Sequence, residues 1–254
     1  MRMSNIGQAL GLFVLGCLPC LSHASAAPGA DGFIQRADVV LAASKAAGAP
    51  LPTSDARVVA LLAATTDQAV YGDAPVTGAD LQKVLNVTAK GSEVMDLYMQ
   101  DGRSQPPSVD EVIATNEKYQ DLLAALLALA AHDGGRGIKA MTMRVASESA
   151  SGRAADMATL GRIRLGIAHL FARLVHTPSA RTGVSPANRA IILEAVVDEA
   201  PTVSAGLTLA ERKDVFAVAD DAARRGPPEE RVTFARIAQA FGDSTCTGFC
   251  TYGH

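Results

Sequence analysis

Two cysteines near the C-terminus are the residues whose spacing most directly suggests chemistry. Three residues separate Cys246 from Cys250, and His254 follows at the same spacing. In an oxidising compartment an isolated pair of this kind most often forms a disulfide. Two thiolates and an imidazole are also ligands that Cu(I) and Zn(II) accept. The sequence therefore predicts a Cys246–Cys250 disulfide, with a metal site completed by His254, or a redox-active or intermolecular role, as alternatives.

A basic stripe is the second candidate for chemistry. Its members are Arg162, His169, Arg173 and His176. They recur at helical intervals and therefore share one face of a helix. Such a face could bind an anion such as phosphate or carboxylate, or pair with the acidic residues Glu194, Asp198 and Glu199 of the next helix. It could equally be a solvated face, where each ion pair contributes about 0–1 kcal/mol.

The third candidate is the dipeptide Glu148-Ser149. It resembles the start of the catalytic motif of the lytic transglycosylases, helical periplasmic enzymes that cleave peptidoglycan with one glutamic acid. The resemblance covers two residues and implies that Glu148 is the catalytic acid. The Gly-Leu-Met-Gln segment of that family is absent, since residues 155–158 read Ala-Asp-Met-Ala. A polar helix end next to Gly152 accounts for the same residues without catalysis.

His132 and Asp133 complete the candidates. They follow an apolar helix and precede a glycine-rich stretch, so we expect His132 near a helix C-terminus. There the helix dipole favours a charged histidine by about 0.3–1 kcal/mol. No motif for a serine or cysteine nucleophile accompanies the pair. We therefore interpret these two residues as structural.

The N-terminus has the pattern of an export signal. Arg2 is followed by an apolar stretch at residues 6–18 and by the small residues Ala24 and Ala26. This order of charge, apolar run and small residues predicts a secretory signal cleaved after Ala26, or else after Ala24. The alternative is a lipoprotein anchored through Cys17. Either way, we expect the protein in the periplasm or secreted.

Composition excludes several classes of protein. The chain has 23 basic and 26 acidic residues, and its net charge of −3 disfavours nucleic-acid binding. Aromatic residues make up 4% and tryptophan is absent, which disfavours stacking platforms for sugars and bases. Beyond the signal, no run of about 20 apolar residues predicts a transmembrane segment. No cofactor is implied.

Nearly every segment has a helical pattern. Capping boxes predict helices that begin after Thr77, Ser108 and Thr208, and Ser185-Pro186 predicts another start. Residues 122–131 are apolar on all sides, which is typical of a helix at the centre of a bundle.

The breaks between the helices complete the expected fold. We expect the chain to break at residues 133–137, a candidate hinge, and then to form helices at 138–148 and 154–176. Between these two helices, Ser151-Gly152 is the expected joint. Together the signals predict an all-α, irregular bundle of about eight helices with no sheet.

The expected organisation is a signal peptide at residues 1–26, a helical domain at 27–241 and a cysteine-containing tail at 242–254. We expect an exported protein with a non-catalytic binding or envelope-associated role, whose partner is another protein or an envelope component. Two alternatives remain. One is a metal-handling protein that uses the cysteine pair and His254, and the other is a peptidoglycan-cleaving enzyme that uses Glu148.

Overall fold

The computed structural model describes residues 29–101, 108–148, 150–179, 183–243, 245–246 and 249–252. Within these residues the chain forms nine α-helices and two short 3-10 helices, and no strand. The predicted all-α irregular bundle is therefore confirmed, with one helix more than expected. The predicted signal peptide and Cys17 lie outside the described residues.

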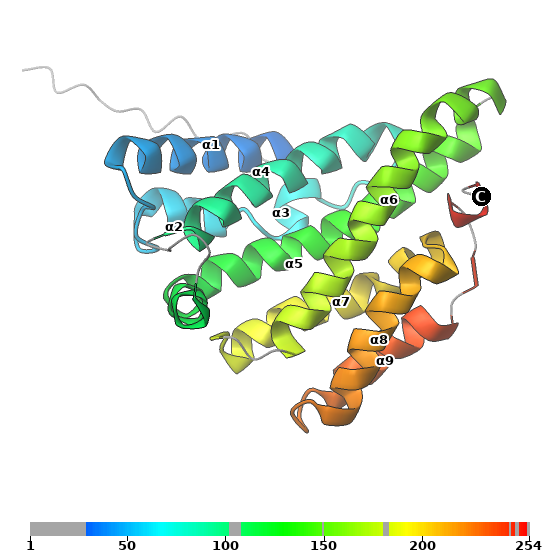
Figure 1. Ribbon diagram of the computed structural model, residues 1–254. Coiled ribbons are helices and arrows are strands. Elements are labelled where there is room, and N and C mark those ends of the chain that lie inside the picture. The colour runs from blue at the N-terminus through cyan, green and yellow to red at the C-terminus, as the bar shows by residue number, and fades with distance from the viewer. Residues whose placement is uncertain are drawn as a thin grey trace, which may run out of the picture.

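The helices follow one another with short connections (Figure 1). They are α1 (Ala30–Ala47), α2 (Ala56–Leu62), α3 (Asp67–Tyr71), α4 (Leu81–Met99), α5 (Val109–Ser147), α6 (Ala150–Ser179), α7 (Pro186–Gly206), α8 (Leu209–Arg225) and α9 (Arg231–Asp243), with the 3-10 helices η1 (Gly78–Asp80) and η2 (Phe249–Tyr252).

The predicted helix starts are present. Ser108 and Thr208 form complete capping boxes at α5 and α8, and Ser185 caps α7 directly before Pro186. The capping box at Thr77 opens η1, which leads straight into α4. These caps satisfy backbone N–H groups that have no partner inside the helix, so a local sequence signal is enough to fix where each helix begins.

Two hydrophobic cores share the long helix α5. Leu122, Leu126 and Leu129 pack with buried residues of α1, α2 and α4. Further along, Ile138 and Met141 pack with buried residues of α6 to α9. In Figure 1, α5 crosses the molecule between α4 and α7. A helix that is buried from several directions needs apolar residues all round, as the sequence predicted.

The helix break expected at residues 133–137 is wrong, because α5 continues through them. The glycines there make room for neighbouring helices. A Cβ on Gly134 would lie 2.7 Å from the Phe171 ring of α6, and one on Gly135 would lie 1.8 Å from the Glu199 carboxylate of α7. Glycine in a helix interior costs about 1 kcal/mol, and close packing offsets that cost here. A hinge at these residues stays a prediction, without a helix break behind it.

The boundary between α5 and α6 also differs from expectation. The joint between α5 and α6 lies near Glu148 and not at Ser151-Gly152.

Inside α5 the backbone leaves helical geometry at Tyr119 (φ −121°, ψ 15°), and Figure 1 shows the first turns of α5 bending away. The Tyr119 hydroxyl donates a hydrogen bond of 2.5 Å to Asp101, which ties the bend to the end of α4.

The C-terminal tail returns to the bundle. The Sγ atoms of Cys246 and Cys250 lie at bonding distance, 2.06 Å, with their Cα atoms 5.7 Å apart. Phe249, between them in sequence, is fully buried in the core that contains α6 to α9. Its ring lies 5.3 Å from the Arg164 guanidinium of α6.

Candidate functional site

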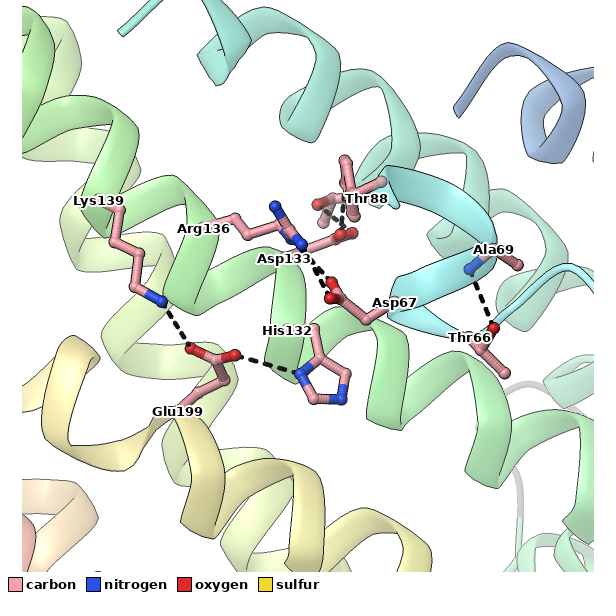
Figure 2. Close-up of polar contacts among 10 residues, drawn as sticks. Thr66, Asp67, Ala69, Thr88, His132, Asp133, Arg136, Lys139 and Glu199 are labelled. Carbon is pink, nitrogen blue, oxygen red and sulfur yellow. Dashed lines mark hydrogen bonds and ion pairs between the residues drawn. The ribbon is translucent and has the colours of Figure 1, made fainter. Parts of the chain in front are cut away.

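A cluster of charged side chains surrounds the middle of α5 (Figure 2). On α5 it contains His132, Asp133, Arg136 and Lys139, and the partners come from α3, α4 and α7. Three of these residues, His132, Arg136 and Lys139, follow one another at intervals of four and three. Successive turns of α5 therefore carry them on one side of the helix. We call this group the α5 charged cluster.

The short helix α3 supplies two partners because of its caps. The Thr66 hydroxyl accepts a 3.1 Å hydrogen bond from the Ala69 amide and so begins the helix (Figure 2). Gly72, with a φ of 61°, ends it. Asp67 and Tyr71 are four residues apart, one turn of helix, and both reach α5. Two side chains of α3 thus meet two side chains of α5.

Asp67 and Arg136 form the first of these contacts. Nε and Nη2 of Arg136 donate to the two carboxylate oxygens at 2.7 and 2.8 Å. Burial alone would raise the pKa of Asp67, but the hydrogen bonds and charge of Arg136 outweigh it and lower that pKa. The guanidinium also lies 4.5 Å from the centre of the Tyr71 ring. Such a forked pair is strongly oriented and holds α3 against α5.

Asp133 forms the second contact and is almost completely buried, with 2% of its surface exposed. The Tyr71 hydroxyl donates to one carboxylate oxygen at 2.6 Å, and the Thr88 hydroxyl of α4 donates to the other at 2.8 Å. Burial raises the pKa of Asp133 to about 7, although both hydrogen bonds favour the ionised form. One carboxyl group therefore joins α3, α4 and α5.

Glu199 of α7 approaches the other side of the cluster. Its carboxylate lies 3.2 Å from Nδ1 of His132 and 3.9 Å from Nζ of Lys139 (Figure 2). Contact with Glu199 raises the pKa of His132, against the opposing effect of burial. Gly135 makes this approach possible, since any Cβ there would overlap the carboxylate.

A groove of about 600 Å³ opens beside the cluster. Its charged lining consists of Asp67, Arg136, Lys139 and Glu199, and Thr142 and Thr202 add hydroxyl groups. Its apolar lining includes Pro75, Val76, Ile138 and Met143. This volume lies within the range of about 300–1,000 Å³ that is usual for small-molecule sites. We call it the charged groove.

The charged side chains of the charged groove differ in how closely they are paired. Arg136 already makes two short hydrogen bonds to Asp67. Among the residues that the structure describes, Lys139 has one acidic partner, Glu199, at 3.9 Å, which is too long for a hydrogen bond, and its side chain is about half exposed. Within the described residues, Lys139 is therefore the charged group of the groove that is best able to take a new partner.

The structure corrects the expected position of His132 and Asp133. Both were expected near a helix end, but they lie in the interior of α5. Neither is held by the helix dipole; Glu199 contacts His132, and Tyr71 and Thr88 contact Asp133. The two side chains point to different neighbours, so they do not act as a dyad.

The predicted basic stripe lies on the outside of α6. Its members Arg162, His169, Arg173 and His176 are all exposed. None of them forms an ion pair with an acidic residue in the described part of the chain. The expected partner Glu199 is engaged with α5 instead. An anion-binding role for this face stays a prediction.

Glu148 lies where α5 ends. One of its carboxylate oxygens accepts a 2.9 Å hydrogen bond from Nε of Arg144, and Arg144 also pairs with Asp156. Glu148 does not line the charged groove. The structure thus places it in an ion-pair network at the joint between two helices.

The cysteine pair has the geometry expected of a disulfide, whereas His254 lies outside the described residues. Among the side chains that the structure describes, no group of three or more His, Cys, Asp or Glu residues is arranged to hold a metal ion. In the same part of the chain, none of the helices is long and apolar enough to cross a membrane.

Sequence reasoning missed most of the α5 charged cluster. Asp67, Tyr71, Thr88, Arg136 and Lys139 were not among the candidate residues. The spacing of His132, Arg136 and Lys139 was a usable signal, but it was hidden by the expectation of a break. For α3, the pair Thr66-Asp67 and the following Gly72 had the pattern of a short capped helix.

The chain was also compared with known proteins. No family model matches it, and neither the curated proteins nor the solved structures contain a match.

Proposed function

We propose that the protein is an exported, non-catalytic binding protein, and that it binds a small anionic solute in the charged groove. The observation that carries this proposal is the half-exposed ammonium of Lys139, which lines the groove without a hydrogen bond inside the described part of the chain. A carboxylate or phosphate of the solute would supply that partner as a charge-assisted hydrogen bond.

The surroundings of Lys139 support binding more than catalysis. Asp67 and Arg136 satisfy each other, and Glu199 is held by His132, so these groups form a pre-arranged wall. Asp133, whose pKa is the most strongly raised among the carboxyls of the cluster, is enclosed by hydroxyl groups and does not line the groove. A preorganised wall lowers the ordering cost of binding.

The solute must also be short and partly apolar. The carboxylates of Asp67 and Glu199 repel a second anionic group close to them, while Val76, Ile138 and Met143 offer apolar contact. A short monocarboxylate such as butyrate places its single anion on Lys139 and its alkyl chain on the apolar wall. Inorganic phosphate tests the anion contact alone.

The experiment measures thermal unfolding with butyrate or phosphate, at an ionic strength matched with sodium chloride. We expect at least one of these anions to raise the melting temperature, since a ligand that binds only the folded state stabilises it. Lys139→Gln should remove the increase. Lys213→Gln is the matched control, because Lys213 is an exposed lysine on α8, away from the groove.

Two results would contradict the proposal. One is that none of the anions shifts the melting temperature beyond the sodium chloride reference. The other is that Lys139→Gln keeps the whole shift, which would place the anion elsewhere on the protein.

A further inference from the structure

A second groove lies nearer the start of α5, along residues 112–127, and most of its lining is apolar. It has a volume of about 410 Å³, with α5 as its floor and α4 and α6 as its walls. The apolar side chains include Met95 of α4, Leu123 and Leu127 of α5, and Leu170 of α6. We call it the apolar groove.

The apolar groove lies where the two cores meet, since its lining includes Leu123 of one core and Ala124 and Leu174 of the other. α4 packs on α5 within one core, and α6 packs on α5 within the other. Leu127 shows the consequence. Its neighbour Leu126 is buried as the sequence predicted, but Leu127 was expected in the core and is only partly buried, facing the groove. An apolar side chain left in this way gains from any apolar ligand that covers it.

Two charged residues stand in the walls of the apolar groove. Arg173 of the basic stripe lines the α6 wall, and Asp96 lines the α4 wall. Arg173 is exposed and forms no ion pair with an acidic residue that the structure describes. A guanidinium beside an apolar floor matches a molecule with an anionic head and an apolar chain.

We propose that the apolar groove binds a single-chain fatty carboxylate. The chain lies along α5 against Leu123, Leu127 and Leu170, and the carboxylate contacts Arg173. The groove volume lies within the range of about 300–1,000 Å³ usual for small ligands, and such sites typically combine an apolar lining with a few polar groups. This site is separate from the charged groove, so it does not depend on the function proposed there.

The test uses dodecanoate below its micellar concentration, titrated into the purified protein by calorimetry. We expect one molecule bound per chain. Arg173→Gln should weaken the affinity about tenfold, because it removes one charge-assisted contact. Asp96→Asn, which removes the opposite charge from the facing wall, should leave the affinity unchanged or higher. Arg162→Gln, on the same stripe but outside the groove, is the control and should bind like the wild type.

Variants that fill the apolar groove with a larger side chain test the proposal independently of the charge at Arg173. Leu127→Trp places a larger side chain over the floor and should abolish binding while the circular dichroism stays helical. Leu170→Trp, on the α6 wall, serves the same purpose if Leu127→Trp fails to fold. Lys139→Gln should bind dodecanoate like the wild type, which separates this site from the charged groove.

The proposal is overturned if dodecanoate does not bind. It is also overturned if both folded tryptophan variants bind dodecanoate as well as the wild type does. Equal loss of affinity in Arg162→Gln and Arg173→Gln would contradict it too, since that result indicates general attraction of the anion to the surface of α6.

Discussion

Among single residues, Asp133 is a buried carboxyl whose pKa is strongly raised by burial. It is enclosed by α3, α4 and α5, and its hydrogen bonds come from Tyr71 and Thr88. Removal from water disfavours the charged carboxylate, which is why its pKa rises from 3.8 to about 7. In the unfolded chain the same carboxyl ionises at its ordinary value.

The sign of the pH effect follows from this difference. Between pH 4 and pH 7 the folded state binds more protons at Asp133 than the unfolded state, so the free energy of unfolding falls as pH rises. The change attributable to Asp133 is on the order of 4 kcal/mol. His132, whose pKa is also raised, acts in the same direction above its ordinary pKa of 6.5.

Asp133→Asn should therefore weaken the pH dependence of the free energy of unfolding. The amide of asparagine has the same shape and no charge to desolvate. Urea denaturation at several pH values measures the free energy of unfolding of both proteins. We expect the wild type to lose stability relative to the variant from pH 4 to pH 7. A difference that stays constant over this range would show that Asp133 does not titrate there.

Gly135 gives a second test at the same scale. Gly135→Ala would place a Cβ 1.8 Å from Glu199, so the carboxylate must leave α5. We expect destabilisation by about 1–3 kcal/mol, typical of overpacking. The control is Gly166→Ala, at an exposed position of α6 where nothing lies within 4 Å of a Cβ. That change should stabilise the protein by up to about 1 kcal/mol through helix propensity. Stabilisation by both changes would mean that α7 does not approach α5 as described.

Among the helices, α5 contributes buried residues to both hydrophobic cores of the bundle. Its apolar stretch at residues 122–131 serves both cores, so Leu126 has no exposed side. Leu126→Ala should destabilise by about 2–5 kcal/mol, from lost burial and a cavity. Leu165→Ala, at a 43% exposed position of α6, should change stability by less than about 0.5 kcal/mol. Similar values for the two variants in chemical denaturation would contradict the packing of α5.

The sequence predicted the helices well where local chemistry determines them. The caps at Ser108, Ser185 and Thr208 need only neighbouring residues. The predicted helix break at residues 133–137 was wrong, because whether a glycine breaks a helix depends on what packs against it. Phe171 and Glu199, which occupy the space beside Gly134 and Gly135, come from distant parts of the chain.

The candidate site was harder to predict for the same reason. Asp67 and Arg136 are 69 residues apart, and Tyr71 and Asp133 are 62 apart. A pattern in one helix can show that His132, Arg136 and Lys139 share a face. It cannot show which acidic residues approach that face, since this depends on how α3 and α7 cross α5.

At the scale of the whole molecule, the C-terminal tail closes the second core. Phe249 is fully buried, and Arg164, whose guanidinium lies over its ring, also pairs with Glu211 of α8 at 2.9 Å. Phe249→Ala should therefore lower the free energy of unfolding by about 3 kcal/mol. Cys246→Ser removes only a short loop closure and should cost no more than about 2 kcal/mol, a few degrees in melting temperature.

Calorimetry of the two tail variants checks this order, with circular dichroism to confirm that both remain helical. The account is contradicted if Cys246→Ser unfolds the protein while Phe249→Ala is tolerated. In that case the cysteine pair, and not the buried ring, holds the tail on the bundle.

We propose that the charged groove beside α5 binds a small anion at Lys139. The most direct test of this proposal is mapping of backbone amide NMR shifts while butyrate is added at constant ionic strength. Binding at Lys139 predicts saturable shifts concentrated at residues 136–143 of α5 and 199–206 of α7, and their loss in Lys139→Gln. Shifts that instead follow the exposed stripe of Arg162, His169, Arg173 and His176 on α6, or that never saturate, would contradict it.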